Sequence, residues 1–396
     1  MNKTKIPSIR FRGFGDAWEQ RKFGDLLQTL PFKQFLKEPE PDGKYEIIQQ
    51  GNEPVIGYAN GTPCGDYKDV VIFGDHTLSL YKPQHPFFVA TDGVRIVKGQ
   101  QDTDGYYLLS LLERYKPQSE GYKRYYSILA DTNCITTYNT SEQEQIGAFF
   151  QQLDNLITLH QRKFEKLTNV KKSMLEKMFP QNGSSYPEIR FKGFTDPWEQ
   201  RKFEEIAVRS SVICSDANLP RVEYEDIVSG AGRLNKDIYA KESSKSGIAF
   251  HQGDVLYGKL RPYLQNWLLP AFDGLAVGDF WVLQPQNADS SFLYRLIQSR
   301  QFDEVANQST GTKMPRADWK LVSKTVFSIP SNICEQAVIG TYFTALDNLI
   351  TLHQRKGKAA VSGCSNDANN SKGVCCKARD FGYKCHKKDE PNRFDA

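Results

Sequence analysis

Apolar residues at heptad spacing predict a long helix in the middle of the chain. Ile146, Leu153, Leu167 and Met174 are separated by multiples of seven residues, which is the pattern of a helix in a coiled coil. Residues 153–163 return unchanged at 346–356, and this predicts a second helix whose apolar stripe could pack against the first. The residues expected to pack are Ile146, Phe149, Leu153, Leu156, Ile157 and Leu167 in the first helix, and Ile339, Leu346, Leu349 and Ile350 in the second.

A second repeat opens each half of the chain. Residues 9–23 return in similar form at 189–203, and both copies contain Trp-Glu-Gln-Arg-Lys. This repeat has an offset of 189 − 9 = 180 residues, whereas the helix repeat has an offset of 346 − 153 = 193. Each half therefore begins with the same opening motif, ends with the same helix and holds its own insert between them, as in a tandem duplication. The aromatic residues of the motif are expected to fill a core.

The sequences of the two inserts predict compact α+β domains. In each insert, short apolar segments rich in β-branched and aromatic residues alternate with turn residues, and one helical stretch follows them. The expected strands are 45–48, 70–73, 87–90, 94–97, 254–257, 267–269 and 280–283, and the expected helices are 106–114 and 292–300.

The two long helices have recognisable starts but different ends. Ser141-x-x-Glu144 matches a capping box, and Asn332-x-x-Glu335 can play the same role. The first helix is expected to run to about Phe179, where Pro180 stops it. After Lys356 the second copy changes to a sequence unrelated to the first, so we expect a shortened helix that ends there.

Composition narrows the class of protein. The net charge of the 396-residue chain is only +4, so an anionic partner would have to be met by local basic patches. There is no signal peptide and no apolar run of membrane-spanning length, which predicts a cytoplasmic protein with no membrane partner. The scattered cysteines Cys64, Cys134, Cys214 and Cys334 suit buried, reduced thiols.

The sequence carries no catalytic motif that we could assign. It lacks a phosphate loop, a Gly-x-Ser-x-Gly elbow, a His-Glu-x-x-His helix and the Asn-Pro-Pro-Tyr or Asp-Pro-Pro-Tyr signature of amino-methyltransferases. We therefore assign no catalytic residue and no metal ligand. Two alternatives stay open: a metal-dependent nuclease built on Asp42, Asp66 and Lys68, and a coiled-coil adaptor that does not bind DNA.

Basic and aromatic loops occupy corresponding places in the two inserts and suit nucleic-acid binding. Lysine and arginine can contact phosphates, while arginine, asparagine and glutamine can contact base edges. The candidate DNA-binding residues are Lys123 and Arg124 in the first half, and Lys259, Arg261, Gln265, Asn266, Thr312, Lys313 and Arg316 in the second.

With these motifs the chain resembles the specificity subunits of type I restriction-modification systems over residues 9–356. The doubled opening motif and the doubled helix carry the resemblance, with support from residues 310–314, Ile329-Pro330 and Glu335-Gln336. The resemblance implies a non-catalytic subunit with two target-recognition domains, each of which reads one half of a split, asymmetric site in double-stranded DNA. It also implies an antiparallel two-helix spacer between them.

The same resemblance implies the partners. Two modification (methyltransferase) subunits would supply S-adenosylmethionine, and restriction (translocase-nuclease) subunits would use ATP and Mg²⁺, whereas this chain would bind no cofactor itself. The expected organisation is a first recognition domain at 1–141, a spacer helix at 142–180, a linker at 181–186, a second recognition domain at 187–331, a shortened spacer helix at 332–356 and a divergent, disordered tail at 357–396.

Two features depart from the family pattern. In the first insert, Gly121 to Arg124 alone represents the Thr-Gly-x-Lys loop, and Thr137-Tyr138-Asn139 replaces Ile-Pro. The tail, which contains Cys364, Cys375, Cys376, Cys385 and His386, has three interpretations: a disordered appendage from a frame change or recombination, a disulfide knot, or a zinc site. If the two helices are antiparallel, a shortened second helix would expose apolar residues of the first, either Leu167, Val170, Met174 and Leu175 or whichever residues of the stripe face the missing segment, and this would favour oligomerisation.

Overall fold

The computed structural model describes residues 6–181, 183–240, 244–308 and 314–365, with side chains as far as residue 357. The chain forms two compact units, one of Met1–Leu159 with Lys358–Ala396 and the other of His160–Gly357. Both unit boundaries fall inside the repeated helices, so each unit holds one insert domain and a part of the spacer.

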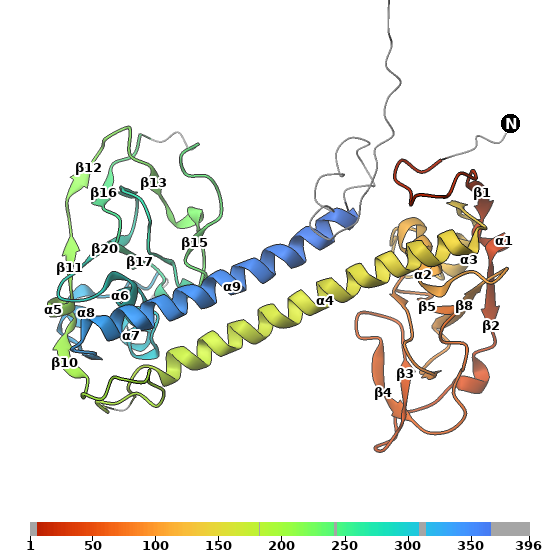
Figure 1. The fold of residues 1–396 in the computed structure, drawn as a ribbon, viewed down its shortest axis with the longest axis horizontal. Coiled ribbons are helices and arrows are strands. Elements are labelled where there is room, and N and C mark those ends of the chain that lie inside the picture. The colour runs from red at the N-terminus through yellow and green to blue at the C-terminus, as the bar shows by residue number, and fades with distance from the viewer. Residues whose placement is uncertain (1–5, 182, 241–243, 309–313, 366–396) are drawn as a thin grey trace, which may run out of the picture. The chain divides into compact units, whose positions relative to one another are not determined.

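The first unit contains a four-stranded sheet in the order β2-β8-β5-β6 and a three-stranded sheet in the order β4-β3-β7. Alternate residues of β5 enter different cores: Val71 and Phe73 join the cluster beneath α2, while Val70 and Ile72 join the cluster on the other face. Burial on both faces explains the unbroken apolar run. The elements are β1 (Glu19–Lys22), α1 (Phe23–Leu26), β2 (Leu27–Leu30), β3 (Tyr45–Ile48), β4 (Val55–Ala59), β5 (Val70–Gly74), β6 (Leu80–Tyr81), β7 (Phe87–Val89), β8 (Val94–Gly99), α2 (Gly105–Tyr115), α3 (Tyr126–Asp131), β9 (Asn133–Thr136) and α4 (Thr140–Lys177) (Figure 1).

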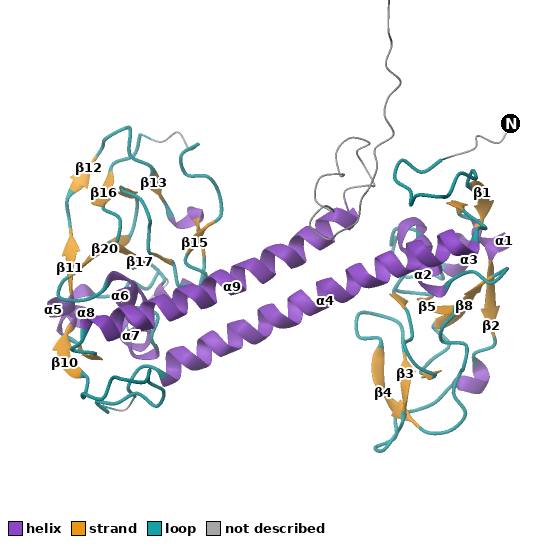
Figure 2. Cartoon of the chain, viewed as in Figure 1, coloured by secondary structure: helices purple, strands orange, loops and turns teal. Residues whose placement is uncertain are grey.

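The second unit repeats this frame. Its sheet β11-β20-β17-β18 has the same strand order, while its other sheet, β12-β16-β19-β13, has no counterpart of the same order in the described part of the first unit. The main elements are β10 (Glu199–Lys202), α5 (Phe203–Ile206), β11 (Ala207–Ser210), β12 (Ile213–Cys214), β13 (Arg221–Val222), β14 (Ile227–Val228), β15 (Arg233–Leu234), β16 (Gly247–Phe250), β17 (Val255–Gly258), β18 (Trp267–Leu268), β19 (Gly274–Ala276), β20 (Phe280–Pro285), α6 (Ser290–Leu296), α7 (Arg300–Ala306), α8 (Trp319–Lys324), β21 (Val326–Ile329) and α9 (Ile333–Ser365) (Figure 2).

The strands expected from the sequence are all present, with shifts of one or two residues at their ends. The expected helix at 106–114 is α2, but the one at 292–300 is wrong: α6 ends at Leu296 and α7 starts at Arg300. The Ser299 side chain accepts a hydrogen bond from the Phe302 amide, so it caps a new helix at this point.

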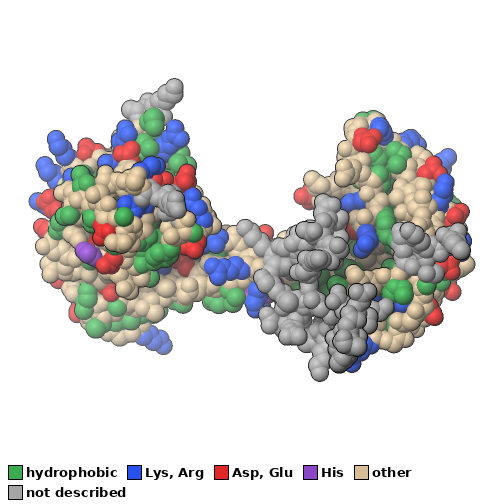
Figure 3. Space-filling view, turned by 90° about the horizontal axis from the view of Figure 1, so that it is seen from above, with side chains coloured by type: hydrophobic (Ala, Val, Ile, Leu, Met, Phe, Trp, Pro, Cys, Tyr) green, Lys and Arg blue, Asp and Glu red, His purple; other side chains and the backbone are tan. Residues whose placement is uncertain are grey.

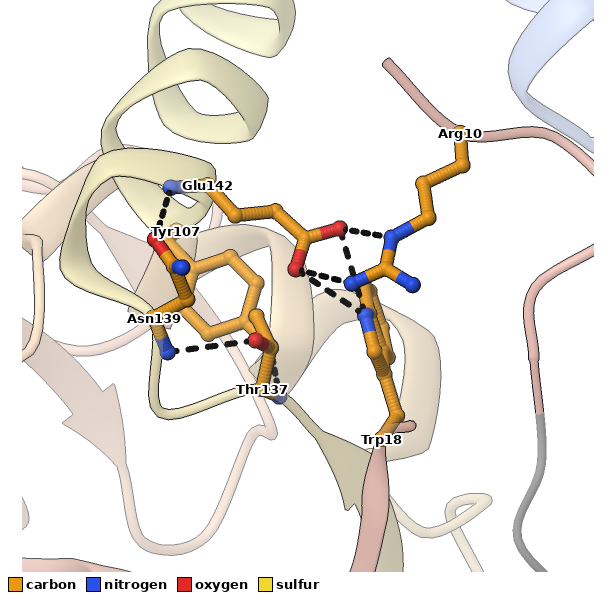
Figure 4. A network of polar contacts seen from close by, with 6 residues as sticks. All are labelled: Arg10, Trp18, Tyr107, Thr137, Asn139 and Glu142. Carbon is orange, nitrogen blue, oxygen red and sulfur yellow. Dashed lines mark hydrogen bonds and ion pairs between the residues drawn. The ribbon is translucent and has the colours of Figure 1, made fainter. Parts of the chain in front are cut away.

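The opening motif is fixed to the start of α4 by a buried carboxylate. Arg10 donates to both oxygens of Glu142, at 2.5 and 2.8 Å, and the indole N–H of Trp18 lies 3.3 Å from the same group (Figure 4). Arg10, Trp18 and Glu142 are called the first clamp below. This contact gives the opening motif a structural role that accounts for its recurrence in both halves: its arginine and tryptophan position the spacer helix.

The second unit contains the same arrangement, the second clamp, made of Arg190, Trp198 and Glu335. Arg190 donates to Glu335 at 2.7 and 2.8 Å, and the Trp198 indole donates at 3.3 Å. Trp198 is buried in the core, which agrees with the expectation that the aromatic residues of the motif fill a core.

The first helix start differs from the expectation. α4 begins at Thr140, and Asn139 Oδ1 accepts from the Glu142 amide at 3.0 Å. The predicted capping box of Ser141 and Glu144 is therefore wrong, because the cap lies two residues earlier. In the second unit, Asn332 does cap α9, accepting from the Cys334 amide at 2.9 Å.

The clamp makes the stability of the first unit depend on pH. Burial raises the pKa of Glu142, but hydrogen bonds from Arg10, Thr137 and Trp18 outweigh it, and the pKa is lowered from its ordinary value of 4.5. A lowered folded-state pKa means that Glu142 stabilises the fold above pH 4.5 and that this contribution is lost as the pH falls through the folded value.

We therefore expect the stability advantage of the wild type over Glu142→Gln to shrink below pH 4.5. Hydrogen exchange in β8, compared between the two proteins at each pH, measures this advantage within the first unit. If the wild type is more stable than Glu142→Gln by the same amount above and below pH 4.5, the lowered pKa of Glu142 is contradicted.

The second spacer helix is longer than expected. α9 continues past Lys356 to Ser365 and has 33 residues, against 38 for α4. The expected end at 356 is wrong because each glycine costs only about 1 kcal/mol in a helix, and the Lys-Ala-Ala that follows Gly357 favours helix. Residues 366–396, with Cys375, Cys376, Cys385 and His386, lie outside the described part of the chain, so the interpretations of the tail stay predictions.

Within the second unit, α9 covers the C-terminal part of α4. Leu167, Met174 and Leu175 pack against the core cluster that contains Ile339 and Phe343, and Val170 is half-buried. The expectation that these α4 residues are exposed is wrong, because the antiparallel arrangement brings the start of α9, not its end, onto this part of α4.

The buried positions of α9 follow a three-four spacing with one change from the expected set. Ile339, Phe343 and Leu346 are buried and Ile350 is half-buried, whereas Leu349 is 44% exposed. Leu349 lies one position off the stripe. In α4, the expected residues Ile146, Phe149, Leu153, Leu156, Ile157 and Leu167 are all half-buried.

Candidate nucleic-acid interface

In the second unit, the loop between β17 and β18 lies against the segment before α8. The Arg261 amide donates to the Pro315 carbonyl at 2.8 Å, and the Ala317 amide donates to the Lys259 carbonyl at 2.8 Å. Arg261 and Gln265 adopt positive φ angles of 50° and 54° on either side of a single 3-10 turn. These two segments form one surface, called the second-unit loop surface.

Asp279 organises the cations of this surface. Its carboxylate lies 3.5 Å from Lys259 Nζ and 3.0 Å from an Arg316 nitrogen, and its carbonyl accepts from the Tyr224 hydroxyl. Burial raises the pKa of Asp279, but Arg316 and Lys259 outweigh this effect and lower it. Part of the positive charge is thus neutralised in the free protein.

The structure separates the predicted DNA-binding residues of this half. Lys259, Arg261, Gln265 and Arg316 belong to the second-unit loop surface, and Arg261 is exposed. Asn266 is buried, which argues against a base contact by its side chain. The remaining two predicted residues, Thr312 and Lys313, lie outside the described residues.

In the first unit, Lys123 and Arg124 are exposed in the segment before α3. Lys123 pairs with Glu120 at 2.8 Å. The neighbouring Tyr122 is 87% exposed, and its ring stacks on His76 at a centroid distance of 4.6 Å. Our sequence analysis missed His76, because the signal is structural: the residue lies in the loop between β5 and β6, which corresponds to the loop between β17 and β18.

The nuclease alternative receives no support from the geometry. Asp66 lies 3.9 Å from Lys98, and the backbone carbonyl of Asp42 accepts from Asn60. Among the described residues, no three His, Cys, Asp or Glu side chains are grouped so that they could hold a metal ion.

The spacer helices meet through polar groups as well as apolar ones. Within the second unit, His160 Nδ1 and His353 Nδ1 lie 2.9 Å apart. The pKa of both side chains is lowered, mainly by burial. Lys171 pairs with Asp347 at 2.7 Å, and Asp347 also accepts from the buried Arg295 at 2.7 Å. This ion triad fixes α4, α6 and α9 to one another.

The surface charge agrees with the low net charge. On the face shown in Figure 3, Lys and Arg side chains are interspersed with acidic and apolar ones. No helix in the described part of the chain is both long and apolar enough to cross a membrane. Of the four scattered cysteines, Cys64 and Cys134 are buried as expected, whereas Cys214 is half-buried and Cys334 is exposed.

Comparison with known proteins finds similar sequences and a similar fold. No family model matches the chain. The specificity subunit of the type I restriction enzyme EcoDI from Escherichia coli is 24% identical over 161 residues, which is 38% of this chain and 36% of the relative. The specificity subunit of the type I restriction enzyme MjaVIII from Methanocaldococcus jannaschii is 22% identical over 244 residues, or 56% of each chain.

The chain is similar in sequence to type I restriction specificity subunits. The matched stretches span about a third and about a half of these two relatives. The crystal structure of a type I restriction-modification S subunit from M. genitalium has the same fold: the TM-score is 0.62 at 13% identity, with 91% of this chain and 97% of that chain covered. The relatives bear out the resemblance drawn from the doubled motifs, and the structural match bears out the α+β class.

Proposed function

We propose that this chain is the DNA sequence-specificity subunit of a type I restriction-modification complex. It would bind a split, asymmetric site in double-stranded DNA and carry no catalytic group itself. The observation that supports this most strongly is the combination of a repeated frame with unlike surfaces. Both units share the sheet order and the clamp, but one surface carries Lys259, Arg261 and Arg316, and the other carries Tyr122 to Arg124.

The frame explains how two different half-sites can be read at a fixed spacing. α4 begins at the first clamp and ends in the second unit, so its 38 residues form one continuous helical connection between the domains. We infer that this helix, with a rise of about 1.5 Å per residue, would set the separation of the two DNA half-sites.

The partners follow from the same proposal. Two modification subunits would bind S-adenosylmethionine and methylate adenine, and restriction subunits would use ATP and Mg²⁺ for translocation and cleavage. Supplied with DNA, S-adenosylmethionine and Mg²⁺, the purified chain should neither methylate nor cut. Metal-dependent cleavage that is lost in Asp66→Ala would favour the nuclease alternative instead.

Arg261 is the strongest single candidate for a DNA contact in the second unit. It is exposed, and no side-chain partner is recorded for it among the described residues, whereas Lys259 is held by Asp279. Arg261→Ala should weaken DNA binding by the assembled complex by about 1–3 kcal/mol, at one base pair if the arginine reads a base and uniformly if it contacts phosphate.

DNA affinity measured over a series of salt concentrations shows whether Arg261 contacts a base or a phosphate. Loss of a phosphate contact reduces the number of counterions released on binding by about one, and so makes the affinity less dependent on salt. Arg300→Ala is a matched control, since Arg300 is an exposed cation of the same unit that pairs with Glu304. If Arg261→Ala binds like the wild type at every salt concentration, Arg261 does not contact DNA. DNA affinity that is absent even with modification subunits would favour the adaptor alternative.

A further inference from the structure

A stacked ring pair in the first unit joins the exposed Tyr122 to the half-buried His76. Tyr122 and His76 come from segments far apart in the sequence, yet their rings are almost parallel, with an interplanar angle of 1°. Tyr122 is one of the most exposed large side chains among the described residues. Such a pair leaves a flat aromatic face in solvent and has no role in either core of this unit.

The loop that carries His76 is held rigidly. The His76 amide donates to Gln50 Oε1 at 3.1 Å. The Thr77 and Ser79 hydroxyls lie 2.8 Å apart. At Gly74 a Cβ atom would lie 2.8 Å from Gln50 Cβ, so glycine lets the loop approach Gln50 closely. Preorganised loops of this kind lose little entropy on binding.

The hydrogen bond of His76 fixes its tautomer. Nδ1 lies 2.9 Å from the carbonyl oxygen of Lys123. A carbonyl oxygen only accepts, so Nδ1 must carry the proton, and Nε2 of the neutral ring is left as an acceptor. His76 therefore presents one defined acceptor beside two cationic side chains, Lys123 and Arg124.

The pair occupies the place that the second-unit loop surface occupies in the other domain. The loop of His76 joins the third and fourth strands of a sheet with the same order, as does the loop of Arg261. In both units the backbone of this loop is hydrogen-bonded to the segment before a short helix, α3 in the first unit and α8 in the second. The Tyr125 amide donates to the Asp75 carbonyl, and the Arg261 amide donates to the Pro315 carbonyl.

We propose that His76 and Tyr122 are the base-contacting residues of the first recognition domain, an inference that rests on the proposed function. The acceptor Nε2 matches an amino group in the major groove, either cytosine N4 or adenine N6. The Tyr122 ring stacks on the imidazole and holds its plane. Lys123 and Arg124 hold the neighbouring phosphates.

Selection from a pool of random duplex DNA tests this inference. The full chain, alone and with the modification subunits, is incubated with the pool, and the bound sequences define the motif. His76→Ala should reduce the preference at one base pair of one half-site by about 2- to 10-fold, as expected for the loss of one hydrogen bond. Tyr122→Ala should affect the same half-site, while Tyr122→Phe, which keeps the ring, should leave the motif unchanged.

Two controls separate the possible outcomes. The other half-site should stay intact in both alanine variants, which shows that the protein is folded, and Arg261→Ala should affect only that other half. If His76→Ala and Tyr122→Ala both select the wild-type motif, the inference is overturned while the proposed function stands. A wild-type chain that enriches no motif under either condition contradicts the proposed function and this inference with it.

Discussion

Asp347→Ala should lower the free energy of unfolding of the second unit by about 3 kcal/mol, which makes it one of the two most damaging single changes expected. Asp347 joins Lys171 on α4 to Arg295 on α6, both at 2.7 Å. The Arg295 side chain is only 2% exposed, so its charge would lose its carboxylate partner away from water. The figure lies at the lower end of the range for buried pairs because Asp347 is itself 26% exposed.

The repeat offers a matched control for this change. Asp154 occupies the same position of the repeated helix segment in α4, but it is exposed and has no recorded cation partner among the described residues. Asp154→Ala should therefore change stability by about 0.5 kcal/mol or less.

Urea unfolding followed by tryptophan fluorescence measures the effect of Asp347→Ala, because four of the five tryptophans, all except Trp18, lie between residues 160 and 357 in the second unit. Asp154 lies in the first unit, so hydrogen exchange in β8 measures the effect of Asp154→Ala. Equal losses for Asp347→Ala and Asp154→Ala would show that the ion triad does not stabilise the unit.

The clamps predict the other large effect. Glu335→Ala should cost about 3–5 kcal/mol, because it leaves the Arg190 guanidinium and the Trp198 indole N–H without their acceptor. The side chain of Glu335 is only 2% exposed, so water cannot replace the lost carboxylate. The first unit contains the same contact, so Glu142→Ala should destabilise it by a similar amount.

Glu199→Ala is the control for the clamps. It breaks an arginine–carboxylate pair with Arg201 at 2.7 Å, but both side chains are more than a third exposed. Exposed pairs contribute about 0–1 kcal/mol. The same fluorescence measurement applies to Glu335→Ala and Glu199→Ala. A Glu335→Ala protein as stable as Glu199→Ala would mean that the opening motif does not hold the spacer helix.

Much of the architecture could be predicted because the opening motif and the spacer-helix segment each occur twice in the sequence. The repeated segments at 153–163 and 346–356 carry the heptad pattern. The runs 70–73 and 280–283 are rich in β-branched and aromatic residues and are followed by turn residues, which favours strands. The clamps were not foreseen. Arg10 and Glu142 are 132 residues apart, and only their shared recurrence at Arg190 and Glu335 could have linked them.

The errors have local physical causes. Leu349 and Ile350 are both apolar and adjacent, so the sequence alone does not decide which one faces the core. The end of α9 was misplaced because loss of sequence similarity after Lys356 is not loss of helix propensity. His76 was missed because the residues that give it a role, Gln50, Tyr122 and Lys123, come from distant segments.

The measurement that tests the central claim most directly is a domain exchange. Residues 24–140 are replaced by the corresponding insert of another specificity subunit, both flanking repeats are kept, and the methylated sites are mapped in cells that supply the modification subunits. If each domain reads its own half of a split site, one half-site changes while the other half and the spacing between them are retained. A chimera in which both half-sites change, or in which the spacing is lost, would contradict the modular account.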